Sequence, residues 1–140
     1  MRRALALAAL IATSVGALAT AGSASAEHWT KFANGDNGTE WSYDSDYSFK
    51  DKETGRAVVM QAISKPSAGI NPSGPPSGVG YVYALDCLKH NVIMIIAYKP
   101  SVPFAMPTGW RADTPKKAGG SEDEALFAAV CPTADRLPVK

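Results

Sequence analysis

The chain has 140 residues and is almost neutral, with 14 basic and 13 acidic side chains. This balance argues against nucleic acid or an anionic membrane surface as the partner, because both require concentrated positive charge. A chain of this length forms one domain and buries enough surface for a hydrophobic core.

The first 26 residues have the three parts of a cleavable export signal. Two arginines supply the positive start, residues 4–12 are apolar, and Ala24-Ser25-Ala26 supplies the small residues that a signal peptidase needs. Thr, Ser and Gly interrupt the rest, whereas an uncleaved membrane helix would need about 20 mostly apolar residues. We therefore expect a periplasmic or secreted domain of residues 27–140 with no membrane span. The first residue after the predicted cleavage site is Glu27, so the cysteine to which a lipid anchor is attached is absent from this position.

Cys87 and Cys131 are the two cysteines of the chain, and both follow the predicted cleavage site. Export brings them to a compartment where thiols are oxidised, so a single intramolecular disulfide is the simplest pairing. A free catalytic thiol or an intermolecular bond is the alternative.

Aromatic residues surround a turn-rich segment near the start of the domain. Residues 29–32 and 40–44 flank Asn34-Gly35-Asp36-Asn37-Gly38, which predicts a β-hairpin. In its second arm Trp41 and Tyr43 share one face, as expected where that face meets a core. After a short arm at 47–49, the apolar run 56–63 predicts a strand covered on both sides.

Two strong strand patterns lie in the middle of the chain. Residues 81–88 and 92–98 are joined by a short polar turn, and Val92 to Ala97 has no polar face, which predicts a central strand. Before them, Ser64 to Gly80 is rich in proline, glycine and serine and predicts a long mobile loop. Alternation places four residues on one face of the strand: Tyr81, Tyr83, Leu85 and Cys87. Because Cys87 is expected to bond Cys131, this face should be directed toward the C-terminal segment.

The last third of the chain predicts an irregular segment followed by a helix. Four prolines interrupt residues 100–115, whose large apolar side chains are free to cover a sheet edge or face. Ser121 and Glu124 form the pattern of a capping box, and the helix continues to Val130 with Leu126 and Phe127 on its apolar stripe. The fold class is therefore α+β: an antiparallel sheet of about five or six strands, with one short C-terminal helix tied to it by the disulfide.

This series of features resembles the surface-adhesin protein E-like family of small exported bacterial proteins. The markers are Trp29, Tyr43-Asp44, the predicted central strand, Cys87, the paired strand, Trp110, the capped helix and Cys131. The resemblance covers nearly all of residues 27–140. It implies an antiparallel sheet with a helix, binding to host extracellular-matrix or serum proteins, and homodimers. The sequence departs from the lipid-anchored adhesin because Glu27, and not a cysteine, stands directly after Ala26.

No catalytic, metal or cofactor pattern stands out. His28 lies next to the predicted cleavage site, and His90 lies in a hairpin turn where a solvated side chain is the simpler interpretation. Asp44 and Asp46 are interpreted as polar loop residues, and Asn34, Asp36 and Gly38 as turn residues, not calcium ligands. We expect no enzyme activity, no cofactor and no metal.

These observations favour an exported, non-catalytic, adhesin-like binding module. The predicted contact surface combines the Ser64 to Gly80 loop with Tyr81, Tyr83 and Phe104, since aromatic side chains are favoured at binding surfaces. The alternative is a periplasmic inhibitor or accessory factor that acts on an enzyme. A third hypothesis, a hydrolase, would need His90 beside an acid and a hydroxyl group.

Overall fold

The computed structural model describes residues 27–73, 78–99 and 102–140. The predicted export signal, residues 1–26, lies outside the described residues. Within the described ranges, no helix combines the length and the apolar composition that crossing a membrane requires.

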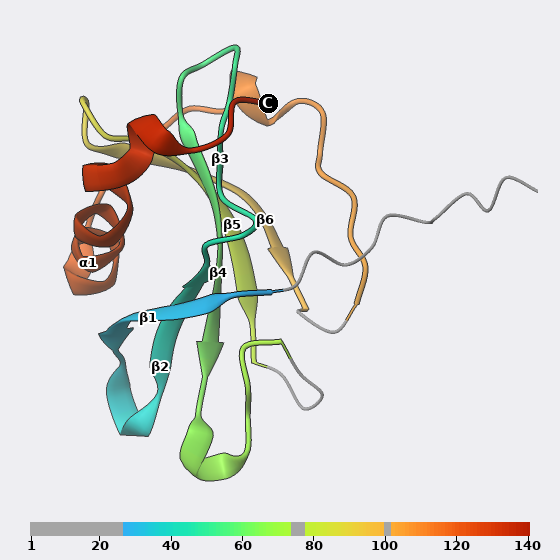
Figure 1. Cartoon of the computed structure of the whole chain (residues 1–140), viewed down its shortest axis with the longest axis vertical. Coiled ribbons are helices and arrows are strands. Elements are labelled where there is room, and N and C mark those ends of the chain that lie inside the picture. Colours follow the sequence, from blue (N-terminus) through green and yellow to red (C-terminus); the bar gives the residue numbers. More distant parts are fainter. Residues whose placement is uncertain (1–26, 74–77, 100–101) are drawn as a thin grey trace, which may run out of the picture.

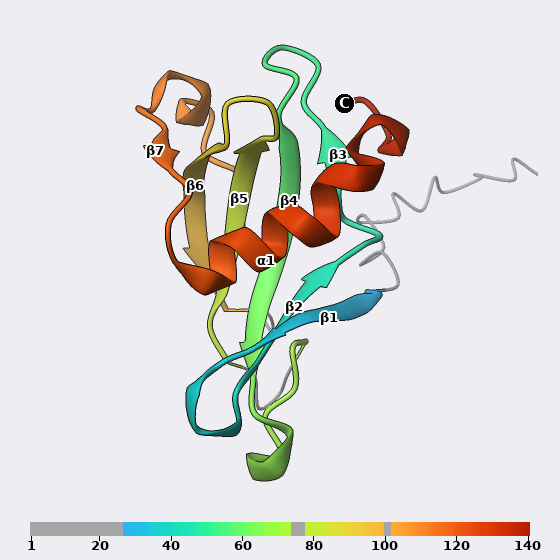
Figure 2. The same cartoon turned by 90° about the vertical axis from the view of Figure 1, so that its left-hand side faces the viewer.

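An antiparallel sheet forms the centre of the fold, and α1 (Gly120–Val130) runs across one of its faces (Figures 1 and 2). The strand order is β1-β2-β4-β5-β6-β7, and β3 pairs with β4 beside this series. The strands are β1 (Trp29–Asn34), β2 (Glu40–Asp44), β3 (Phe49–Lys50), β4 (Ala57–Ser64), β5 (Gly80–Asp86), β6 (Asn91–Tyr98) and β7 (Lys116–Lys117). This arrangement confirms the predicted α+β class.

Both faces of the central strands are buried, which explains the mostly apolar sequence of β4. Toward α1, Leu126, Phe127 and Val130 pack on side chains of β4, β5 and β6, as the predicted helix stripe requires. On the opposite face, Trp110 is buried against the sheet, with Phe104 and Met106 packed around it. The proline-rich segment therefore acts as the second cover of the sheet.

The N-terminal hairpin is confirmed, but its second strand is buried on both faces. Tyr43 packs on the α1 side, with its ring 6.2 Å from that of Phe32. Ser42 and Asp44 on the opposite face are more buried still. The Asp44 carboxylate accepts hydrogen bonds from the backbone N–H groups of His28, Asp46 and Tyr47. The interpretation of Asp44 as a polar loop residue is therefore wrong, because this carboxylate organises the turn after β2.

The first part of the predicted loop from Ser64 to Gly80 forms a defined turn. Ser64 is the last residue of β4 and Gly80 the first of β5. Between them, a short 3-10 helix at Pro66–Ala68 closes a tight turn in which Lys65 and Ile70 pair. Gly69 has φ +71°, the left-handed conformation that glycine adopts without strain. Residues 74–77 lie outside the described part.

The prediction that Val92 to Ala97 forms a central strand is wrong. The central strands are β4 and β5, whereas β6 lies near the end of the sheet and is followed only by the two residues of β7. The strand lacks a polar face because both of its faces are partly covered. Its two exposed residues before Lys99, Met94 and Ala97, are apolar and therefore gave no sign of an edge.

The predicted capping box at the start of α1 is also wrong. No side chain caps the helix at Gly119, and Ser121 lies one residue inside the helix, exposed to solvent. Instead, the Asp123 carboxylate accepts a hydrogen bond from the Gly119 N–H at 3.0 Å. After Val130 the chain continues as a 3-10 helix, Cys131–Arg136, that accommodates Pro132 in its first turn.

The predicted disulfide between Cys87 and Cys131 is present, with the two Cα atoms 5.8 Å apart. Cys87 follows β5 and Cys131 follows α1, so the bond holds the end of the helix against the sheet. It also closes a long segment that contains β6, β7 and α1, and it therefore restricts the unfolded chain strongly.

We expect the Cys87→Ala/Cys131→Ala double variant to lose about 4 kcal/mol of its free energy of unfolding, the chain-entropy value for a loop of this length. Urea unfolding of the variant and the unreduced protein measures the difference. Mass spectrometry of the unreduced protein should find two hydrogens fewer than in the reduced chain. An equal free energy of unfolding with and without a thiol reductant would contradict this role of the bond.

Candidate functional site

A hollow of about 450 Å³ lies at the outer edge of β6, between β7 and the N-terminus of α1. We call it the edge hollow. Its floor comes from β5 and β6, and its wall comes from the segment that leads into α1. The lining residues are Tyr83, Val92, Ile93, Met94, Asp113, Thr114, Lys116, Lys117, Gly119 and Asp123. A volume of this size is typical of ligand or side-chain pockets.

The floor of the edge hollow is apolar and aromatic. Tyr83 on β5 and Met94 on β6 are direct cross-strand partners, so their side chains lie on the same face. Met94 is 54% exposed, an unusual fraction for a large apolar side chain on a sheet. Burial raises the pKa of Tyr83 to about 12, with smaller contributions from Asp123 and Tyr81, so its phenol is neutral at physiological pH.

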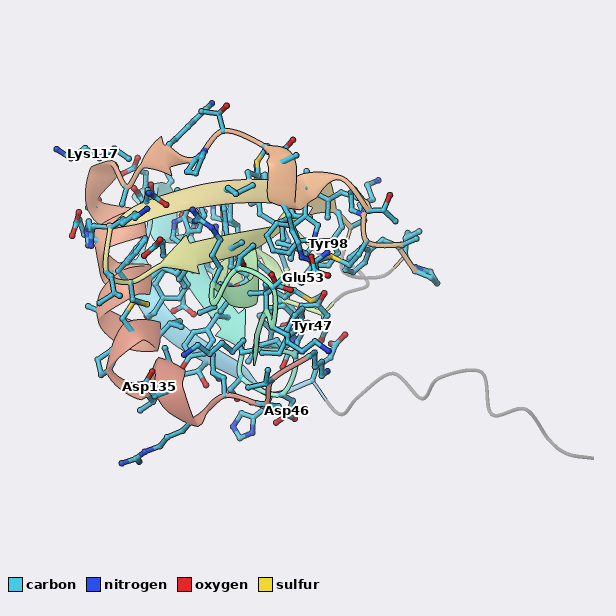
Figure 3. The ribbon with its side chains drawn as sticks, turned by 90° about the horizontal axis from the view of Figure 1, so that it is seen from above. Asp46, Tyr47, Glu53, Tyr98, Lys117 and Asp135 are labelled. Atoms are coloured by element: carbon cyan, nitrogen blue, oxygen red, sulfur yellow. A yellow bond between two sulfur atoms is a disulfide. The ribbon has the colours of Figure 1, made fainter. Side chains whose placement is uncertain are left out.

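The wall of the edge hollow carries charged side chains. Lys116 and Lys117 are exposed, and neither forms an ion pair with another residue among those described. Asp113 is exposed as well, whereas the Asp123 carboxylate is occupied by the Gly119 N–H. Figure 3 shows Lys117 pointing away from the body of the protein. The hollow therefore combines an apolar floor with solvated ammonium groups at its rim.

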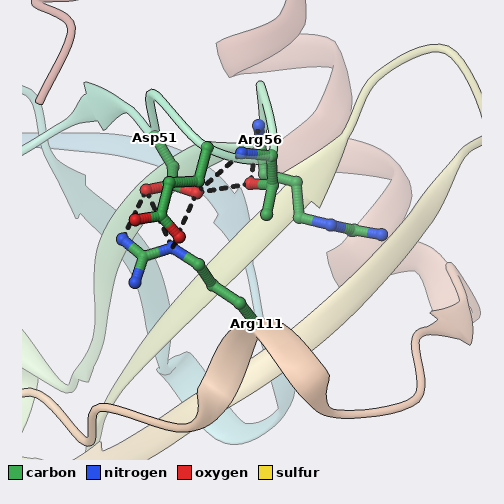
Figure 4. Close-up of polar contacts among 5 residues, drawn as sticks. Asp51, Arg56 and Arg111 are labelled. Atoms are coloured by element: carbon green, nitrogen blue, oxygen red, sulfur yellow. Dashed lines mark hydrogen bonds and ion pairs between the residues drawn. The ribbon is translucent and has the colours of Figure 1, made fainter.

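One end of this wall is held by an ion pair between Asp51 and Arg111 (Figure 4). The Asp51 carboxylate accepts from Arg111 Nη2 at 2.6 Å and from Nε at 3.1 and 3.2 Å. Thr54 donates its backbone N–H and its hydroxyl to the same carboxylate. The Arg111 guanidinium lowers the pKa of Asp51 to about 2, aided by Thr54 and opposed by burial. The wall begins two residues after Arg111, at Asp113.

The other end of the wall is held by His90. Its carbonyl oxygen accepts a hydrogen bond from the Ala118 N–H at 3.1 Å. Its ring Nε2 lies 2.9 Å from a carboxylate oxygen of Glu124, and the ring lies 4.4 Å from that of Phe127. The His90 side chain is 43% exposed, as expected in a turn, but it also joins the β5–β6 turn to α1 and to the wall.

The structure places the predicted binding residues on two different faces. Tyr83 lines the edge hollow, and Tyr81 lies beside it with ring centroids 5.9 Å apart. Phe104 packs on Tyr98 on the opposite side of the sheet, so the three residues do not form one surface. Figure 3 shows Tyr98 on the side of the sheet away from α1. Met94 was missed as a candidate because it was assigned to a central strand.

The described residues offer few groups for catalysis or metal binding. Within residues 27–73, 78–99 and 102–140, no cluster of three or more His, Cys, Asp or Glu side chains could hold a metal ion. Both cysteines are joined in the disulfide. The hydrogen-bond partner of the His90 ring is Glu124, not a hydroxyl group.

Comparisons with known proteins give no relatives for this chain. No family model matches the sequence, and no curated protein or solved structure shows significant similarity to it. The resemblance to the surface-adhesin protein E-like family therefore stays a prediction that rests on the residues quoted for it.

We expect the Asp51→Asn variant to unfold at a lower urea concentration than the unmodified protein at pH 7. The folded pKa of Asp51, about 2, lies below its ordinary value of 3.8, so its stabilising contribution is complete above about pH 4. That contribution is lost as the pH falls toward 2. The gap between the two urea midpoints should therefore narrow over this range.

The matched control for this experiment is Glu53→Gln. Glu53 also contacts Arg111, at 3.2 Å, but its carboxylate is mostly exposed, so its removal should change the urea midpoint little. A Glu53→Gln effect equal to that of Asp51→Asn, or a gap independent of pH, would contradict the role given to Asp51.

Proposed function

We propose that this chain is an exported, non-catalytic binding module that captures another protein at the edge hollow. The observation that carries the proposal is the exposed Met94 side chain beside the half-buried ring of Tyr83, in a hollow at the edge of the sheet. Met and Tyr are enriched at protein interfaces, where they provide large contact areas. Thioethers also adapt to irregular partner surfaces.

The rigidity of the site supports this proposal. The wall of the hollow is held at Asp51 and at His90, and the disulfide holds the far end of α1. A preformed hollow binds more tightly than a flexible one, because less conformational freedom is lost on binding. The Asp51 and His90 contacts and the disulfide thus all stabilise the same proposed binding surface.

The proposed setting is the periplasm or the outside of the cell. The disulfide agrees with an oxidising compartment, and the sequence of residues 1–26 predicts the export step. The adhesin-like resemblance implies a host matrix or serum protein as the partner. An endogenous enzyme as the partner would instead indicate the inhibitor or accessory role.

Site-specific photo-crosslinking in the native cells tests the proposal. The photoreactive residue replaces Met94 in one variant of the full chain and Leu88 in the control, because Leu88 is 98% exposed but lies outside the edge hollow. We expect a discrete protein adduct from position 94 and none of that mass from position 88. Mass spectrometry of the adduct identifies the partner as a host protein or an endogenous enzyme.

Two outcomes would contradict the proposal. The same adducts from both positions would show nonspecific contact with exposed residues. No adduct from position 94, under conditions in which the unmodified chain is exported and oxidised, would show that the edge hollow is not a protein-binding surface. Adding Tyr83→Ala to the position 94 variant should weaken the adduct, because it removes the aromatic floor of the hollow.

A further inference from the structure

The outer edge of β6 is paired over a small part of its length. β7 pairs with Asn91 and Val92, and in the described part of the chain no strand lies beyond residues 93–98 (Figure 2). β7 is only two residues long, and Pro115 directly precedes it. The edge hollow lies where β7 ends.

The register identifies the backbone groups that face this open edge. The Ala118 N–H donates to the His90 carbonyl, so that carbonyl points outward, whereas the His90 N–H donates to the Asp86 carbonyl within the β5–β6 turn. Alternation in an antiparallel strand then directs Val92 and Met94 outward as well. Lys116 pairs with Val92, whereas no described strand pairs with Met94. After the irregularity in the β5–β6 register near Ile95, the next outward residue is Ala97.

The edge hollow lies directly against this unpaired backbone. Ile93 and Met94 both line it, although consecutive strand residues point to opposite faces of a sheet. The Ile93 side chain is buried in the core on the face opposite α1, so the hollow lies beside the backbone of these two residues. The groups offered there are a main-chain donor and acceptor with an apolar side chain on each face, which is the chemistry that recognises another strand.

We propose that the protein partner enters the edge hollow as an extended segment and adds to the sheet as a strand beside β6, pairing at Met94 and Ala97. This inference rests on the proposed binding function and specifies its mode. Alternate side chains of the incoming segment would contact Tyr83 and Met94 on the α1 side of the sheet. Main-chain hydrogen bonds would provide affinity, and the hollow would select one apolar side chain.

Charge favours an acidic segment over a second copy of this chain. Lys99 lies at one end of the open edge and Lys116 and Lys117 at the other, and all three are exposed. In a two-fold pairing of two β6 strands with Met94 opposite Ala97, Lys99 of each copy would reach the position beside Val92 of the other, which Lys116 already occupies. Like charges placed together in this way oppose self-pairing. Carboxylates at both ends of a foreign segment would be attracted there instead.

Nuclear magnetic resonance on the full, disulfide-bonded chain tests the inference with defined probes. The first probe is a hexapeptide that alternates valine and threonine between two terminal glutamates. The second has the same sequence with N-methylated valines, and the third replaces the glutamates with lysines. We expect the first peptide to slow hydrogen exchange at the Met94 amide, and the other two to bind at least about tenfold more weakly.

Two variants of Met94 distinguish the contribution of the backbone N–H to peptide binding from that of the side chain. Met94→Ala removes the thioether, whereas Met94→Pro also removes the outward N–H, which bonds no neighbour in β5. We expect Met94→Pro to weaken binding of the first peptide about tenfold more than Met94→Ala does. Urea unfolding verifies that both variants fold. Lys116→Glu/Lys117→Glu, which leaves the strand intact, should weaken the first peptide and strengthen the lysine peptide.

Several results would overturn strand addition. These are equal binding of the N-methylated peptide, equal effects of Met94→Pro and Met94→Ala, or no change at the Met94 amide at about 1 mM peptide. Protection of that amide that grows with protein concentration alone would identify a second copy as the occupant and overturn the choice of a foreign segment. If strand addition fails but the position 94 crosslink is found, the binding function stands with a different mode. If the crosslink also fails, both proposals fall.

Discussion

The ion pair of the buried Asp51 carboxylate with Arg111 determines where the C-terminal half of the chain packs on the sheet. The Asp51 side chain is fully buried, and a buried carboxylate is stable only when charged or polar groups satisfy it. Arg111 provides that partner from a position 60 residues away in the sequence. The pairing fixes the short 3-10 helix that begins with Trp110 and sets the start of the wall at Asp113.

Other local constraints define the rest of the edge hollow. β7 begins directly after Pro115, and the Ala118–His90 hydrogen bond then connects the chain to the β5–β6 turn. Gly120, at φ +81°, allows the sharp change of direction into α1. Because β7 is only two residues long, the outer edge of β6 beyond Val92 pairs with no strand in the described part of the chain. Stability and the candidate site depend on the same contacts.

Much of the fold could be predicted because its signals are local. Both hairpins, the doubly covered β4, the helix stripe and the disulfide follow from alternation, turn residues and compartment. The position of β6 could not be predicted in this way, because its edge residues Met94 and Ala97 are apolar and resemble those of a central strand. The Asp51–Arg111 and His90–Glu124 pairs were missed because no local pattern links such distant residues. Tyr83 was selected because it is an aromatic residue next to the predicted loop, and the structure places it in the lining of the edge hollow.

From Met94 onward the outer edge of β6 pairs with no strand among the described residues, and amide hydrogen exchange of the full chain without any partner tests this central claim most directly. Val92 is paired with Lys116, so its amide should be protected, whereas the outward amide of Met94 should exchange at nearly the rate of an exposed loop. Equal protection of the Val92 and Met94 amides would contradict the account, because the edge would then already be occupied.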